Sequence, residues 1–484
     1  MRLRGSSAHR SYIGGGYVSA TSDETHEVLD PSTGQAVGTV EMAGQPEVDL
    51  AVAAAKAAFP DWSAATPATR SGALVELARI LRERSGELAE LESRQAGKPI
   101  KLSREFDVPG TIDNVAFFAG AARNLEGKAA GEYSGDHTSM IRREAVGVVG
   151  SIAPWNYPLQ MAGWKVLPAI AAGNTIVLKP AEITPLTSLL FAEACTDAGV
   201  PAGVVNVICG RGSVVGQHLV GHPDVSMVSF TGSTGVGVQV MQTAALTAKR
   251  MHMELGGKAP LVVFDDADLE AAVQGAVAGS LINTGQDCTA ATRAYVQRPL
   301  YEAFVAGVAD VMGTVRLGPT LDPTTDQGPL VSVRQQASVA AMVERARADG
   351  AKVVRGGQIP GGALAAGAYY EPTLIVDAAQ ASEVVQEEIF GPVLVVLPFD
   401  SDDEGLRLAN DTPYGLVAYV YTADLARGLR VSEALESGMV GLNRALVSDP
   451  AAPFGGVKHS GLGREGGHDG LLEYLESKYI AVQW

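Results

Sequence analysis

Short apolar runs alternate with longer amphipathic stretches along the chain from about Ala145 onward. The runs are rich in valine and isoleucine and cover residues 146–153, 175–179, 204–209, 227–231 and 261–264. The stretches between them, such as Leu186 to Asp197, carry apolar residues at helical spacing. Uninterrupted apolar runs of this length are typical of parallel strands that are buried on both faces and joined by helices. The pattern therefore predicts a doubly wound α/β domain whose ligand binds at the carboxyl ends of the strands.

The rest of the chain predicts elements that flank this domain. A small hairpin is expected over 12–18, and helical spacing predicts helices over 47–59, 68–95 and 105–124. The segment 131–143 is polar and alternating, which suits an exposed arm. A second α/β half is expected from about Gly257 to Ala452, followed by an amphipathic tail over 471–480.

One stretch places a thiol among small and polar residues: Asn283-Thr284-Gly285-Gln286-Asp287-Cys288-Thr289. It follows an apolar segment, 271–282, that is expected to be a helix packed into a core. Cys288 is therefore a candidate nucleophile, and the alternative is that it is only a small buried apolar side chain. Further polar groups and glycines follow the predicted strands: Trp155, Asn156, Lys179, Glu182, Gly212, Gly232, Ser233 and Glu254.

The glycines in Gly232-Ser-Thr-Gly235-Val-Gly237 stand in the wrong order for the usual dinucleotide fingerprint. If the pattern were taken literally, Glu254 would bind the ribose. Glu254 instead lies in Met253-Glu-Leu-Gly-Gly-Lys258, at a strand end where a carboxylate can point into a cleft. Gly232 and Ser233 can still bind a dinucleotide through backbone N–H groups at a helix N-terminus.

Composition narrows the possible functions. The chain has 484 residues, 46% of them hydrophobic and 19% charged, and a formal net charge of −17, which disfavours nucleic acid and anionic membranes as partners. Three cysteines are too few and too scattered for a disulfide framework or a zinc cluster, and the eight histidines form no ligand spacing with them, so no metal is expected. Neither an apolar leader nor a run of about 18 apolar residues is present, so we expect a cytoplasmic protein.

Seven motifs, in order along the chain, resemble those of the NAD(P)-dependent aldehyde dehydrogenase superfamily from about Asp30 to the C-terminus. They are Pro154-Trp-Asn-Tyr-Pro158, Lys179-Pro-Ala-Glu182, Phe230-Thr-Gly-Ser233, Met253-Glu-Leu-Gly-Gly257, Gly285-Gln-Asp-Cys288, Glu387-Glu-Ile-Phe-Gly-Pro392 and Pro453-Phe-Gly-Gly456.

The resemblance implies a Rossmann-type NAD-binding domain, an α/β catalytic domain and a β-arm for oligomerisation. Their expected ranges are 1–124 with 145–256 for the first, 257–452 for the second, and 125–144 with 453–484 for the arm and C-terminal tail. The final strand is expected near Lys478 to Trp484. A homodimer or homotetramer follows from the same resemblance.

The resemblance also implies the roles of single residues. Cys288 would be the nucleophile, Glu254 the general base and Asn156 a donor of the oxyanion hole. The residues expected to bind NAD are Ile152, Trp155, Lys179, Glu182, Gly212, Phe230, Gly232, Ser233, Glu388 and Phe390. The carboxylate of Glu182 would repel a 2′-phosphate, so NAD is expected to be preferred over NADP. A thiol hydrolase and a catalytically silent nucleotide-binding protein are the alternative function classes.

Two substrate classes compete. The stretch from Gly441 to Glu465 is similar to succinate-semialdehyde dehydrogenases, whereas 117–123, 137–143 and 285–291 are similar to γ-aminobutyraldehyde dehydrogenases. Where the first group supplies arginines for a substrate carboxylate, this chain has the apolar Trp164 and Ile282. A cationic substrate end would instead be bound by Asp287, Asp107, Asp113, Tyr157 and Trp164. We therefore predict oxidation of an ω-aminoaldehyde, first of all 4-aminobutyraldehyde, with succinate semialdehyde or a broad range of aldehydes as the alternative.

Overall fold

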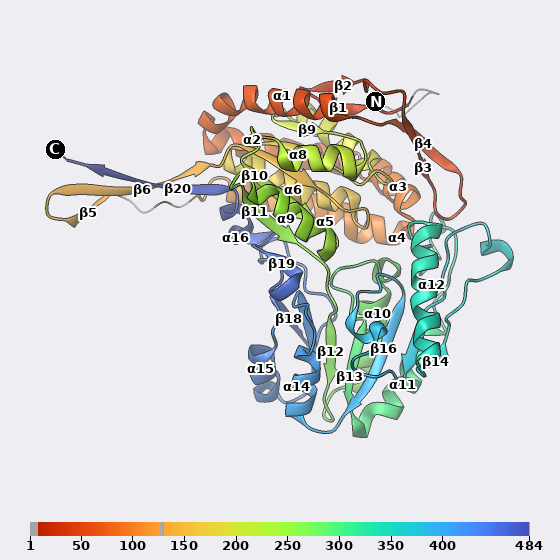
Figure 1. Ribbon diagram of the computed structural model, residues 1–484. Helices are drawn as coiled ribbons and strands as arrows, with labels where there is room; N and C mark the ends of the chain where they lie inside the picture. Colours follow the sequence, from red (N-terminus) through yellow and green to blue (C-terminus); the bar gives the residue numbers. More distant parts are fainter. Residues whose placement is uncertain (1–7, 126, 128–129, 484) are drawn as a thin grey trace.

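The protein is described by a computed structural model that covers residues 8–125, 127 and 130–483. Two large sheets form the body, one above the other in Figure 1. The upper sheet has eight strands in the order β19-β11-β10-β7-β8-β9-β1-β2. Its strands are β1 (Ser11–Ile13), β2 (Gly16–Val18), β7 (Val148–Ile152), β8 (Thr175–Lys179), β9 (Val205–Val207), β10 (Met227–Thr231), β11 (Arg250–Glu254) and β19 (Gly461–Leu462).

The five central strands of this sheet are parallel, and the chain winds outward from β7 in both directions. The helices of this half are α1 (Gln45–Ala64), α2 (Pro67–Glu83), α3 (Ser85–Ala96), α4 (Ile100–Leu102), α5 (Val108–Ala121), α6 (Pro158–Ala172), α7 (Leu186–Asp197), α8 (Gln217–Gly221), α9 (Thr234–Ala245) and α16 (Gly467–Leu472). Because β8 and β10 flank β7, the winding reverses there, and the carboxyl ends of β7 and β10 form the usual ligand site of such sheets. The predicted doubly wound fold is thus confirmed.

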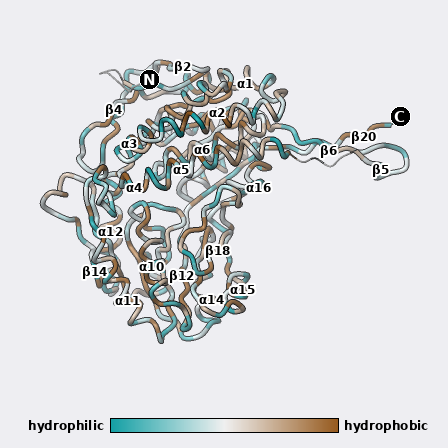
Figure 2. Tube along the Cα trace, turned by 180° about the vertical axis from the view of Figure 1, so that it is seen from behind, coloured by the Kyte–Doolittle hydropathy of each residue, from teal (hydrophilic) through white to brown (hydrophobic). Residues whose placement is uncertain are grey.

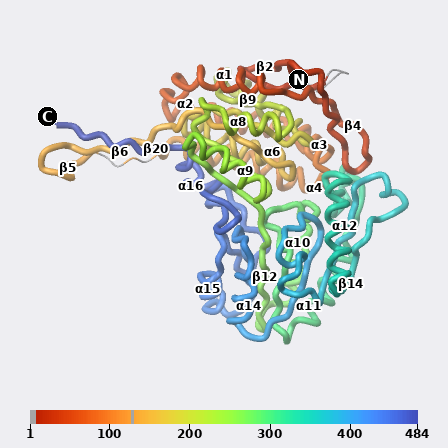
Figure 3. Tube along the Cα trace, viewed as in Figure 1, coloured from red at the N-terminus to blue at the C-terminus, as the bar shows by residue number. Residues whose placement is uncertain are grey.

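The lower sheet has seven strands in the order β14-β15-β16-β13-β12-β17-β18, all parallel to their neighbours except β14. They are β12 (Pro260–Val263), β13 (Arg293–Gln297), β14 (Lys352–Arg355), β15 (Thr373–Val376), β16 (Val393–Phe399), β17 (Val417–Tyr421) and β18 (Met439–Leu442). Its helices are α10 (Leu269–Leu281), α11 (Arg298–Met312), α12 (Val333–Ala348), α13 (Glu383–Gln386), α14 (Asp402–Asn410) and α15 (Leu425–Ala434). In Figure 3 this half is coloured green to blue, which shows that residues after β11 build it.

The apolar runs of the sequence become the expected strands. The runs 175–179 and 227–231 match β8 and β10 residue for residue, and every residue of both strands is buried. The runs 146–153, 204–209 and 261–264 contain or overlap β7, β9 and β12. The hairpin predicted at 12–18 is formed by β1 and β2 around Gly14 and Gly15, both of which have positive φ.

Two helix predictions differ from the structure. The single helix expected over 68–95 is two helices, because the chain turns at Arg84 (φ −95°, ψ 9°) between α2 and α3. The apolar spacing continues through this turn, so the pattern did not reveal it. The helix expected over 105–124 starts earlier, because α4, a wider π-helical turn over Ser103–Asp107 and α5 follow one another without a break from Ile100 to Ala121. Pro109, which has no N–H to donate, occupies the first turn of α5, where none is needed.

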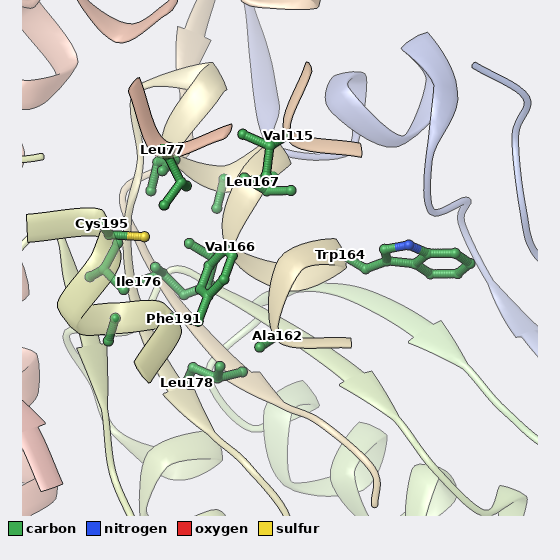
Figure 4. Packing of buried hydrophobic residues seen from close by; sticks show 14 of the residues in the cluster. Leu77, Val115, Ala162, Trp164, Val166, Leu167, Ile176, Leu178, Phe191 and Cys195 are labelled. Atoms are coloured by element: carbon green, nitrogen blue, oxygen red, sulfur yellow. The ribbon is translucent and has the colours of Figure 1, made fainter. Parts of the chain in front are cut away.

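Helix α6 is buried along its whole length and serves both the core and the cavity beside it. Figure 4 shows Val166 beside Ile176 of β8 and Phe191 of α7, and Leu167 toward Leu77 of α2 and Val115 of α5, whereas Trp164 points away from them. Burial of each large apolar side chain contributes about 1.5–3 kcal/mol, so the core side fixes the helix. The position of Trp164 follows from that packing.

A buried carboxylate fixes the start of α6. Glu92 of α3 accepts hydrogen bonds from the backbone N–H of Leu159 (3.1 Å) and from the hydroxyl of Thr187 (2.7 Å). Negative charge at a helix N-terminus satisfies free N–H groups and the helix dipole. Asn156 and Tyr157 directly precede α6, so Glu92 holds the backbone that carries them.

The remaining strands form two small sheets. β3 (Thr25–Leu29) pairs with β4 (Ala36–Glu41), and β5 (Gly131–Ser134), β6 (His137–Ala145) and β20 (Leu475–Val482) form an arm. The arm projects from the body in both Figure 1 and Figure 2. Of the expected arm and tail, β19 and α16 pack on the upper half instead, and residues 126, 128–129 and 484 lie outside the described residues. None of the described helices is long and apolar enough to cross a membrane.

Candidate active site

A cavity of about 1070 Å³ lies at the carboxyl ends of β7, β8, β10 and β11 and is also lined by loops of the lower half. Most of the residues predicted from the sequence line it: Ile152, Trp155, Asn156, Tyr157, Trp164, Lys179, Glu182, Phe230, Gly232, Ser233, Glu254, Asp287, Cys288, Glu388 and Phe390. Gly212, Asp107 and Asp113 do not. The cavity therefore brings together side chains from widely separated parts of the chain.

Cys288 is carried by a loop with an unusual backbone. Three consecutive residues before it, Asn283, Thr284 and Gly285, have left-handed φ values of 49°, 58° and 69°. Such a conformation costs about 1–3 kcal/mol at a non-glycine residue and persists only where the surroundings enforce it. Here a side chain on Gly285 would lie 2.0 Å from the carbonyl oxygen of Gly391. The loop is thus wedged against the Phe390–Gly391 loop and presents the thiol to the cavity.

The thiol and the carboxyl group of Glu254 lie side by side. Burial raises the pKa of the Cys288 thiol well above its ordinary value, and the Glu254 carboxylate raises it further. Burial likewise raises the pKa of Glu254. The charge of Glu465 raises this pKa further, and the Lys165 ammonium lowers it. One oxygen of Glu254 has no hydrogen-bond partner among the described residues. A carboxyl group with a raised pKa beside a thiol is placed to take up and release a proton.

Asn156 supplies a hydrogen-bond donor next to the thiol. Its Nδ2 donates to the backbone carbonyl oxygen of Gln286 at 3.1 Å. The backbone carbonyl oxygen of Asn156 accepts from Asn283 Nδ2 at 2.8 Å. A side-chain amide has two N–H groups, so the second can donate to a substrate oxygen. This arrangement suits an oxyanion hole.

The cofactor end of the cavity fits a dinucleotide. Helix α9 begins directly after Ser233, whose side chain caps none of its N–H groups, so they are available to a pyrophosphate. A side chain on Gly232 would lie 2.7 Å from the Phe230 ring, so glycine keeps this approach open. Lys179 is buried with its Nζ 3.8 Å from a carboxylate oxygen of Glu182. Gly212 acts indirectly, because its N–H donates to Glu182 at 3.2 Å and holds this carboxylate in place.

Glu388 and Phe390 lie on the opposite wall. Glu388 accepts a hydrogen bond from the N–H of Gly257 at 2.9 Å, and burial raises its pKa to about 7. The rings of Phe390 and Trp155 pack edge to face with centroids 5.2 Å apart. This part of the cavity thus combines an aromatic surface with a titratable carboxyl group.

The aldehyde end is aromatic, with one carboxylate. The Trp164 and Phe454 rings lie edge to face at 4.8 Å, and the Tyr157 hydroxyl donates to Asp287 at 2.7 Å. Sequence reasoning missed other lining residues, namely Phe106, Met161, Phe454 and Arg444. Phe454 and Arg444 lie inside stretches that had been singled out, but nothing in the local pattern showed that they face the cavity.

Two predicted substrate contacts are wrong. Asp107 is fully buried, forms an ion pair with the buried Lys98 and does not reach the cavity. Asp113 is exposed on the outer face of α5 and lines a separate surface depression with Arg82 and Arg104. Both acids lie on one helical segment, but they are six residues apart, which at 3.6 residues per turn places them about 120° apart around the helix, so they face different surroundings. Of the predicted acids, only Asp287 remains beside the thiol.

Comparisons with known proteins agree with this geometry. A model described as the aldehyde dehydrogenase family matches residues 17–480. Betaine aldehyde dehydrogenase from Staphylococcus aureus, solved with NAD+, is similar at 37% identity with a TM-score of 0.96, over 98% of this chain and 94% of that one. An aldehyde dehydrogenase from Bacillus cereus in complex with NAD+ is 40% identical, with a TM-score of 0.96, over 99% and 97%. An NADP-dependent enzyme from E. coli is 38% identical, with the same TM-score, over 99% and 98%.

The burial of the cysteines predicts selective alkylation. Cys195 and Cys209 are 0% and 1% exposed, whereas Cys288 is partly exposed. Iodoacetamide should label only Cys288 in the folded protein. Because the pKa of Cys288 is raised, the labelling rate should still increase with pH beyond the ordinary range of thiol pKa values.

Rates measured by mass spectrometry across a pH series check this, with Cys288→Ala as the unlabelled control. Labelling of the other two cysteines at a similar rate, or a plateau at an ordinary thiol pKa, would contradict the burial argument.

Proposed function

The chain belongs to the aldehyde dehydrogenase family and is an NAD-dependent aldehyde dehydrogenase, and on this premise we propose that it oxidises an ω-aminoaldehyde. The substrate we propose first is 4-aminobutyraldehyde, in equilibrium with its cyclic imine, which would yield 4-aminobutanoate. Longer amino- or guanidino-aldehydes belong to the same class. The supporting observation is the Asp287 carboxylate, held beside Cys288 at the end of an aromatic pocket.

In the proposed reaction Cys288 attacks the aldehyde carbon and its proton passes to Glu254. The resulting oxyanion is stabilised by the Asn156 amide and the Cys288 backbone N–H. NAD held at the end of the cavity lined by Lys179, Glu182 and Ser233 would supply the hydride acceptor that this oxidation needs. Loss of hydride from the intermediate leaves a thioester on Cys288. Glu254 passes the first proton to solvent and then removes a proton from the water that attacks the thioester. The carboxylic acid leaves, and the proton returns to Cys288 to regenerate the thiol. The raised pKa of Glu254, caused by its burial, suits a group that both accepts and releases a proton in this reaction.

The pocket supports a substrate with a cationic end. A carboxylate attracts an ammonium group, and aromatic faces attract it through their quadrupoles. Asp287 Oδ1 accepts from the N–H and hydroxyl of Thr289 and Oδ2 accepts from Tyr157, so the carboxylate is held in one orientation. A primary ammonium can donate to such an oxygen, whereas a quaternary ammonium, as in betaine aldehyde, has no N–H. This difference favours an aminoaldehyde over the substrate named for the S. aureus relative.

Succinate semialdehyde remains the second candidate because of Arg444. This arginine lines the cavity, is exposed and has no ion pair among the described residues. A guanidinium can bind a substrate carboxylate through two parallel hydrogen bonds. Asp287 and Arg444 therefore favour opposite substrate charges, and relative rates on the two aldehydes decide between them.

The first prediction compares these substrates. We expect kcat/KM to be higher for 4-aminobutyraldehyde than for succinate semialdehyde. Asp287→Asn removes the attraction for the ammonium and should lower kcat/KM for 4-aminobutyraldehyde by about tenfold. Activity on butanal should change far less, because butanal has no charge. Production of reduced nicotinamide, followed by absorbance, measures all three.

Asp113→Asn is the matched control, because it makes the same change outside the cavity and should leave the ratio unaltered. If succinate semialdehyde is the better substrate, or if Asp287→Asn does not change the ratio, the aminoaldehyde proposal is wrong.

The second prediction concerns the choice of cofactor. Glu182 lines the cavity and is fixed by Lys179 and Gly212, so a 2′-phosphate bound there would meet a carboxylate. We expect NAD to be preferred by tenfold or more in kcat/KM, since like charges a few ångström apart repel by about 1–4 kcal/mol. Glu182→Ser should raise kcat/KM for NADP, while Glu27→Ser, an exposed acid elsewhere, should not. A wild-type preference for NADP would refute this.

The third prediction concerns assembly into a homodimer or homotetramer. Few side chains of the arm are buried, and Tyr133 and Tyr479 on it are 70% and 58% exposed. An exposed edge of this kind is commonly covered by another subunit. Light scattering should show a species larger than the 50.2 kDa chain, and a sample that contains only monomer at micromolar concentration would contradict this.

We also propose the cytoplasmic location expected from the sequence, which cell fractionation tests.

A further inference from the structure

A buried ammonium lies against the wall of the aldehyde pocket. Lys98 Nζ is 3.6 Å from the centroid of the Tyr157 ring, and its side chain is 0% exposed. Lys98 does not line the cavity, whereas Tyr157 does. The ring therefore separates the lysine from the substrate.

The charge of Lys98 is balanced from within the protein. Its Nζ donates to Asp107 Oδ2, and the side chains of both residues are 0% exposed. Burial raises the pKa of Asp107 to about 6, while Lys98 opposes the rise, so the carboxyl group is ionised above pH 7. The other oxygen of Asp107 has no hydrogen-bond partner among the described residues. Lys98 is thus the main partner of Asp107, and the positive end of this pair is the one that touches the ring.

Tyr157 connects this pair to the substrate side. Its hydroxyl donates to Asp287 at 2.7 Å, so charges of alternating sign follow one another from Asp107 through Lys98 and the ring to Asp287. The π electrons of one ring can attract a cation at either face, but two cations at the same ring repel each other and share the same quadrupole. A substrate ammonium at Tyr157 therefore competes with Lys98.

We propose that Lys98, with Asp107 as its counterion, sets how strongly the pocket prefers cationic aldehydes over neutral ones. Lys98 acts through Tyr157 and touches no substrate, so it is a positioning and specificity-determining residue and not a catalytic one. The inference rests on the proposed function, because it assumes that the substrate carries a positive charge. It also gives Asp107 a role that differs from the direct contact expected from the sequence.

The test uses two aldehydes of the same shape. Betaine aldehyde carries a permanent charge, and 3,3-dimethylbutanal replaces its nitrogen by carbon. The ratio of their kcat/KM values measures the preference for charge apart from size. Lys98→Met keeps the length and packing of the side chain but removes the ammonium, so this ratio should rise by about threefold or more, mainly through a lower KM for betaine aldehyde. Lys98→Arg keeps the charge and should leave the ratio near that of the wild type.

Removal of one partner of a buried ion pair can unfold a protein, so a second variant is needed. The double variant that combines Lys98→Met with Asp107→Asn has neither buried charge. It should show the same rise in the ratio of kcat/KM for betaine aldehyde to kcat/KM for 3,3-dimethylbutanal. A purely structural ion pair would lower both kcat/KM values together and leave their ratio unchanged. An unchanged or lower ratio in the double variant would overturn the inference.

The same measurements separate this inference from the proposed function. If the wild type prefers neither betaine aldehyde to 3,3-dimethylbutanal nor 4-aminobutyraldehyde to butanal, but the first ratio rises in both the single Lys98→Met variant and the double variant, the role of Lys98 holds and the proposal of a cationic substrate fails. If the wild type prefers the charged aldehyde and the ratio stays constant in the variants, only the role of Lys98 fails.

Discussion

The site depends on one close backbone contact between the two halves of the molecule. The chain leaves the upper sheet after Glu254 and enters the lower one at Pro260, and the linker between them packs on the nucleophile loop. A side chain on Gly257 would lie 2.2 Å from the carbonyl oxygen of Cys288, so glycine is required at this point. This contact brings the end of β11, and with it the Glu254 carboxyl group, to the thiol. Chemistry that needs both groups is therefore possible only when both sheets are folded and docked.

Burial at this junction also determines the acid–base properties of the site. Loss of water raises the pKa values of Cys288, Glu254 and Glu388 together, because each would be an anion when ionised. A group of buried acids of this kind binds protons more readily than isolated carboxylates and thiols do. The desolvation that raises these pKa values thus suits the groups to the proton transfers of the proposed reaction.

The selectivity that we propose for the pocket depends on charges arranged around one aromatic ring. Asp287 faces the cavity, Lys98 lies behind Tyr157, and Asp107 neutralises Lys98 from further inside. Arg444 adds a cation on the cavity wall. In the proposed function Asp287 favours a cationic substrate end, whereas Lys98 and Arg444 oppose this preference.

The sequence by itself determined the strands, the order of the motifs and the surroundings of the thiol, because these depend on local periodicity and on neighbours along the chain. The runs at 175–179 and 227–231 matched their strands fully, and Cys288, Glu254 and Asn156 lie together as expected. Only the tertiary structure decided which acids face the substrate. Asp107 and Asp113 share one segment with similar periodicity, yet one pairs with Lys98 inside the protein and the other faces solvent. The buried support by Glu92 and Lys98 likewise depends on contacts between distant segments, which local periodicity does not encode.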